Sequence, residues 1–83
     1  MEIKNIVGQN IKFYRFKREI SQEELAHQAN ISTTSISLIE NGRVDIKLSN
    51  LFEISKALDV DIKDLLDFSD KGPLDWRVGL KKN

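Results

Sequence analysis

The sequence predicts an all-α domain, and three observations support this fold class. Apolar residues recur at intervals of three and four over most of the chain, as in helices with one buried face. Ser21 and Ser32 each precede a helix-like segment, and serine is a residue type that often begins helices. These segments end at Asn30 and Gly42, and asparagine and glycine are residue types that often end helices. No apolar run approaches the ~20 residues of a membrane span, so no membrane contact is expected.

Length and composition indicate one small domain. The chain has 83 residues, no cysteine, 40% hydrophobic and 31% charged residues, which is ordinary for a globular protein. Nothing resembles a secretory signal, and we therefore expect a cytoplasmic location. The formal net charge is zero, but residues 1–20 are mainly basic and residues 59–70 mainly acidic. The two ends of the fold should therefore differ in electrostatic potential. The alternative interpretation is that these charged side chains are simply solvated.

The first helix is predicted from Ile3 to about Arg18. Ile3, Val7, Ile11 and Tyr14 follow helical spacing and form its expected inward face.

The second helix begins after Ser21. Ser21 and Glu24 have the spacing of a capping box, in which each side chain bonds the backbone amide of the other residue. Leu25, Ala26 and Ala29 form a narrow inward stripe. Asn30 is expected to end the helix in the left-handed conformation.

The third helix is predicted from about Thr33 to Asn41, with Ser32 as its N-cap. Ile36 and Ile39 face inward, so the opposite rows carry mainly small hydrogen-bonding side chains. Serine and threonine compete for their own backbone and are weak helix formers, which indicates that this helix was not built for stability alone. Such side chains can reach bases or phosphates in a major groove. A solvated face is the alternative interpretation.

The fourth helix runs through about Leu58, and a fifth begins near Asp61 and Asp64. The inward stripe of the fourth helix is predicted to comprise Leu48, Leu51, Phe52, Ile54, Ser55 and Leu58. Ile62, Leu65 and Leu66 are the apolar residues of the fifth. We expect residues 1–70 to form the domain.

Residues 71–83 form a C-terminal tail after the break at Gly72-Pro73. Trp76, Val78 and Leu80 alternate with other residues, so an extended segment could place them on one face as a β-arm. The other interpretation is a frayed terminus.

Residues from about 7 to 66 resemble the XRE-type helix-turn-helix family, which includes the phage lambda repressor and Cro. The matching residues are Ser21-Gln22, Glu24-Leu25-Ala26, Ile31-Ser32, Ser35-Ile36, Ile39-Glu40-Asn41-Gly42, Leu51 and Ala57-Leu58. The resemblance implies a five-helix, lambda-repressor-like DNA-binding domain. It also implies a homodimer that reads a palindromic operator in double-stranded DNA.

The residues expected to contact DNA fall into two groups. The base-reading residues are Thr33, Thr34, Ser37 and Leu38, and the phosphate-binding residues are Gln22, Ser32, Asn41, Arg43 and Lys47. The resemblance further implies a structural ion pair between Arg15 and Glu40. The expected dimerisation residues are Leu66, Phe68 and Trp76.

The chain departs from the family pattern at three places. Glu19-Ile20 replaces the usual Gly-Leu, so Glu19 would have to accept a left-handed or otherwise adjusted backbone. The loop before the fourth helix lacks the usual proline near Ile46 and the usual cap near Lys47. Leu38 stands where relatives commonly carry a long polar or basic residue.

An enzyme is not expected, because the sequence shows no catalytic motif, phosphate loop or metal cluster. We expect no cofactor and no metal site. Two binding functions remain: a transcriptional regulator, and a protein-interaction module such as an antitoxin whose main partner is a second protein.

Overall fold

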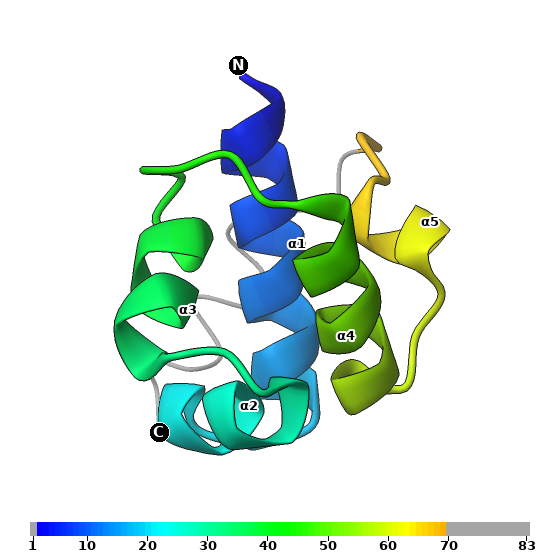
Figure 1. Cartoon of the computed structure of the whole chain (residues 1–83). Coiled ribbons are helices and arrows are strands. Elements are labelled where there is room, and N and C mark those ends of the chain that lie inside the picture. Colours follow the sequence, from blue (N-terminus) through cyan, green and yellow to red (C-terminus); the bar gives the residue numbers. More distant parts are fainter. Residues whose placement is uncertain (1, 70–83) are drawn as a thin grey trace, which may run out of the picture.

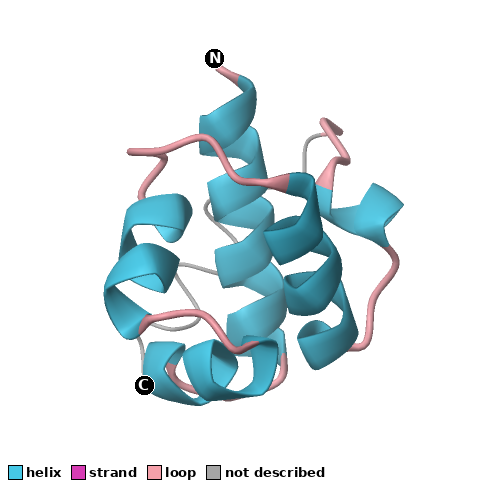
Figure 2. Cartoon of the chain, in the orientation of Figure 1, coloured by secondary structure: helices cyan, strands magenta, loops and turns pink. Residues whose placement is uncertain are grey.

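The computed structural model describes residues 2–69. The described residues form five helices: α1 (Ile3–Lys17), α2 (Gln22–Ala29), α3 (Thr33–Glu40), α4 (Leu48–Leu58) and α5 (Ile62–Leu65) (Figure 1). These residues contain no strand (Figure 2), and the predicted all-α fold is confirmed. The predicted tail 71–83, with its β-arm and Trp76, lies outside the described residues.

The core lies between the five helices. In Figure 1, α1 runs through the middle of the domain, with α3 on one side and α4 and α5 on the other. α2 packs against both α3 and α4, and α1 packs against α3, α4 and α5. The largest residues with less than 2% of their surface exposed are all aliphatic, and they come from all five helices: Ile11, Leu25, Ile36, Leu51, Ile54, Leu58 and Leu65.

Local signals fix most of the helix ends. Ser21 Oγ accepts a hydrogen bond from the Glu24 amide at 3.0 Å. In the described structure the Glu24 side chain does not accept from the Ser21 amide, so only one of the two hydrogen bonds of the capping box is present. Asn30 ends α2 in the left-handed conformation with φ of 58°. Glu19, which stands where the family usually has glycine, also adopts the left-handed conformation, with φ of 58°. Asp59 adopts the same conformation after α4, which we did not predict.

Three residues predicted to face inward are exposed. Ile3 opens α1 and is more than half exposed, while Leu48 opens α4 and is 77% exposed. Phe52 is 48% exposed because it lies about 100° around the helix from buried Leu51. The buried stripe of α4 is therefore narrower than predicted and consists of Leu51, Ile54, Ser55 and Leu58.

Gly8 allows α1 and α3 to approach closely. A Cβ atom at Gly8 would collide with the backbone carbonyl oxygen of Ile39 and would lie 2.8 Å from that of Glu40. A lone glycine inside a helix is the sequence signal for such an approach. The contact holds the C-terminal end of α3 directly against α1.

Candidate nucleic-acid interface

One side of α3 is exposed, and the other side is buried. Thr33, Thr34 and Leu38 are exposed, and Ser37 is half-buried. Ile36 and Ile39 anchor the opposite side in the core. The structure thus directs the four predicted base-reading residues away from the domain interior.

The N-terminal end of α3 is closed by Ser32. Its Oγ accepts a hydrogen bond from the Ser35 amide at 3.0 Å and donates to Ser35 Oγ at 2.9 Å. This is an N-cap, which satisfies one of the helix's free amides. The hydroxyl that we predicted to bind a phosphate is therefore already bonded within the protein.

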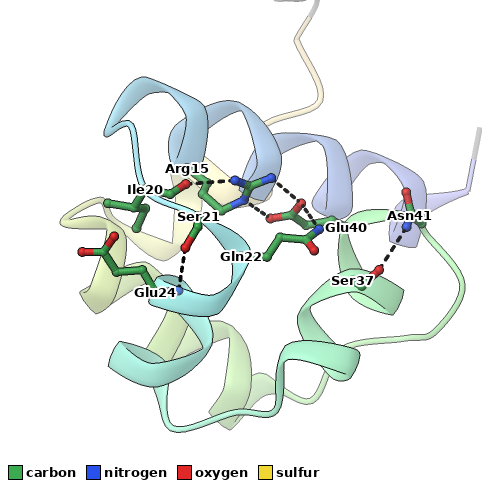
Figure 3. Close-up of polar contacts among 8 residues, drawn as sticks. All are labelled: Arg15, Ile20, Ser21, Gln22, Glu24, Ser37, Glu40 and Asn41. Carbon is green, nitrogen blue, oxygen red and sulfur yellow. Dashed lines mark hydrogen bonds and ion pairs between the residues drawn. The ribbon is translucent and has the colours of Figure 1, made fainter.

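At the other end of the exposed face, Asn41 approaches Ser37. Asn41 Nδ2 donates to Ser37 Oγ at 3.5 Å (Figure 3), which is a long and weak hydrogen bond. Both side chains belong to the polar row of α3. A ligand could replace this bond at little cost.

Arg15 and Glu40 form a buried ion pair beneath α3. Arg15 Nε lies 2.6 Å from Glu40 Oε2, and Arg15 Nη2 donates to Glu40 Oε1 at 3.0 Å (Figure 3). Arg15 Nη1 also donates to the carbonyl oxygen of Ile20 at 2.9 Å. The Glu40 side chain is fully buried and that of Arg15 nearly so. One guanidinium thus joins α1, the turn before α2 and the end of α3.

Gln22 belongs to the same network. Its Nε2 donates to Glu40 Oε1 at 3.0 Å (Figure 3), so the amide that we predicted to bind a phosphate has a protein partner. A primary amide carries two N–H donors. The second N–H of Gln22 therefore remains available in geometric terms, and Glu40 orients it. We did not predict the contact between Gln22 and Glu40.

Arg43 and Lys47 lie in the loop between α3 and α4, and both are exposed. Neither cation forms an ion pair within residues 2–69. Gly42 begins this loop with φ of 68°, and the Asn5 side chain occupies the space where a Cβ atom of residue 42 would lie. The loop is thereby held against the first turn of α1.

The predicted dimerisation residues Leu66 and Phe68 are exposed, at 38% and 59%, and Trp76 lies outside the described residues. Residues 2–69 contain no group of three potential metal ligands among His, Cys, Asp and Glu. None of the described helices has the length and hydropathy to cross a membrane.

Comparison with known proteins identifies the arrangement. A family model described as helix-turn-helix matches residues 11–65, which include α2, α3, Arg15 and Glu40. The chain is 44% identical to control protein C.BamHI of Bacillus amyloliquefaciens over 71 residues, covering 84% of this chain and 88% of that protein.

Two solved structures have a similar fold. The restriction-modification controller protein C.AhdI from Aeromonas hydrophila has a TM-score of 0.73 at 26% identity, covering 75% of this chain and 94% of that chain. The hypothetical transcription factor NHTF from Neisseria has a TM-score of 0.76 at 32% identity, covering 95% of this chain and 85% of that chain.

Proposed function

The chain belongs to the helix-turn-helix family of DNA-binding transcriptional regulators, and from this premise we propose that it acts as a homodimer that reads a palindromic operator through α3. The observation that carries this proposal is the outward face of α3, formed by exposed Thr33, Thr34 and Leu38 and half-buried Ser37. A helix fits the major groove, where hydroxyl groups can bond base edges and leucine can contact thymine methyl groups.

Contacts to phosphates would position this helix in the groove. Gln22 supports this role through its second N–H, since Glu40 holds the first. Arg43 and Lys47 supply exposed positive charge beside Asn41. Ser32 would have to release its bond to Ser35 before its hydroxyl could donate to a phosphate.

The homodimer would place two reading helices in successive major grooves, about 34 Å apart. Exposed Leu66 and Phe68 support a contact at the end of α5, and we assign Trp76 of the tail to the same contact. In this arrangement residues 1–70 form the DNA-binding domain and residues 71–83 the dimerisation arm.

The similarity to C.BamHI and C.AhdI suggests what is regulated. We assign to this chain the control of restriction-modification genes, exerted by binding alone and without an enzymatic step. The protein would act in the cytoplasm.

Replacing Arg43 or Lys47 by alanine is expected to weaken binding to all duplexes by a similar factor. Each change removes one phosphate contact per protomer, and therefore two from the homodimer. The slope of log affinity against log salt should fall by about 0.9 per contact, or about 1.8 for the dimer. The probe is a duplex selected by the wild-type protein from a random-sequence pool, titrated at several salt concentrations. Lys63→Ala is the control, because Lys63 is exposed on α5, remote from α3 (Figure 1).

A selected duplex that binds with a steep salt dependence, and more tightly than random duplexes, would support the proposal. Failure of the wild-type protein to enrich any sequence, or binding that does not respond to salt, would contradict it. That result would favour a protein-interaction module.

A further inference from the structure

Asn10 is a buried polar side chain that has no place among the proposed DNA contacts. It lies on α1 and is only 5% exposed. Its Nδ2 donates to the backbone carbonyl oxygens of Leu65 and Asp67, each at 2.9 Å. These acceptors are 55 and 57 residues further along the chain. One side chain therefore joins the first helix to the end of the last described helix.

The two acceptor carbonyl groups belong to the residues immediately before and after Leu66. α5 has only four residues, and so short a helix has little stability of its own. The carbonyl groups at its C-terminal end also need partners outside the helix. Asn10 supplies both N–H groups of its amide to this end. These bonds fix the backbone at the point where the chain changes from buried Leu65 to exposed Leu66 and Phe68.

Tyr14 lies on the same face of α1 as Asn10 and is close to this segment. It lies one turn after Asn10 on α1. Burial, and then the nearby carboxylates of Asp64 and Asp67, raise the pKa of Tyr14. The face of α1 that carries Asn10 and Tyr14 therefore lies near the end of α5.

We propose that Asn10 is a positioning residue for the homodimer contact: by holding the carbonyl groups of Leu65 and Asp67, it sets the direction in which Leu66 and Phe68 project. This inference rests on the proposed homodimer. An uncharged primary amide is suited to the role because it offers two donors to two acceptors. A carboxylate at this position would face the same carbonyl groups without a donor.

The experiment measures dimer dissociation by sedimentation equilibrium for the full chain. Asn10→Ala and the similarly sized Asn10→Asp are each expected to raise the dimer Kd about tenfold, since two buried hydrogen bonds are lost. Ser55→Ala is the matched control. Ser55 is 3% exposed, and its Oγ donates to the Phe52 carbonyl oxygen at 2.7 Å, so this hydrogen bond stays within α4 and does not involve α5.

Two further measurements separate positioning from general stability. Amide hydrogen exchange should become faster at residues 66–69 in the Asn10 variants and stay unchanged there in Ser55→Ala. Affinity for a duplex carrying one selected half-site should remain within about twofold of the wild-type value, because half-site binding needs no dimer contact.

The outcomes distinguish this inference from the proposed function. A wild-type dimer that the Asn10 variants leave unchanged would overturn the positioning role alone. Unfolding of both variants would also overturn it, because Asn10 would then support the whole domain. A wild-type chain that stays monomeric with and without the selected duplex would overturn the proposed homodimer and this inference together.

Discussion

Replacing Glu40 by glutamine, or Arg15 by methionine, is expected to destabilise the domain by about 3–5 kcal/mol. Each change leaves a buried charged group without its partner, and the Glu40 side chain is fully buried. Domains of this kind have a total stability of roughly 5–15 kcal/mol, so the loss is a large fraction of the whole. The measurement is urea denaturation, in which the midpoint should fall with little change in slope.

Two variants test the physical cause of this loss. Lys56→Ala removes the exposed ion pair with Glu53, whose Nζ–Oε1 distance is 3.4 Å, and should change the stability by no more than about 0.5 kcal/mol. The double variant Arg15→Met with Glu40→Leu should recover part of the single-variant loss, because no buried charge remains unpaired. Single variants as stable as Lys56→Ala would show that the buried pair has no structural importance.

Gly8→Ala is expected to destabilise the domain by about 1–3 kcal/mol, the range of an overpacked core. The sign of this change in stability is informative, because replacing glycine by alanine within a helix normally stabilises the helix by about 1 kcal/mol. Here the added methyl group would collide with the backbone of Ile39 and Glu40, which cannot rotate away as a side chain can. α3 would shift relative to α1, and affinity for a selected duplex should fall as well.

Gln9→Ala is the control for Gly8→Ala. Gln9 is the next residue of α1 and is exposed, so its replacement should change stability by no more than about 0.5 kcal/mol. Thermal unfolding and duplex titration of both variants provide the comparison. A Gly8→Ala protein that is more stable than the wild type would contradict the close approach of α1 and α3.

The helices and their ends were predictable because their causes are local. Ser21, Asn30 and Gly42 act through their own backbone or that of residues within one turn, and such effects are visible in a short window of sequence. The strained position of Glu19 was also predictable, since the usual glycine is missing at a place where the chain must turn. The outward face of α3 was predictable as well, because the spacing of Ile36 and Ile39 within one helix shows which side of it is buried.

Contacts between distant residues were not predictable from such windows. Leu48 and Phe52 have the spacing of core residues, but the described elements leave them largely uncovered. Asn10 gains its role from carbonyl groups more than fifty residues away. The partner of Gln22 likewise depends on how α2 and α3 pack together. These features depend on the tertiary arrangement of the helices, which local patterns do not determine.

The central claim is that the exposed side chains of α3 read base sequence. The most direct test compares the wild-type protein with the triple variant Thr33→Ala, Thr34→Ala and Ser37→Ala, using the selected duplex and a scrambled duplex of equal length and composition. The wild type should prefer the selected duplex by about 10³-fold or more. The variant should lose most of this preference, keep only what Leu38 contributes, and remain folded. A folded triple variant that keeps the wild-type preference would contradict the account, because Thr33, Thr34 and Ser37 would then not read base sequence.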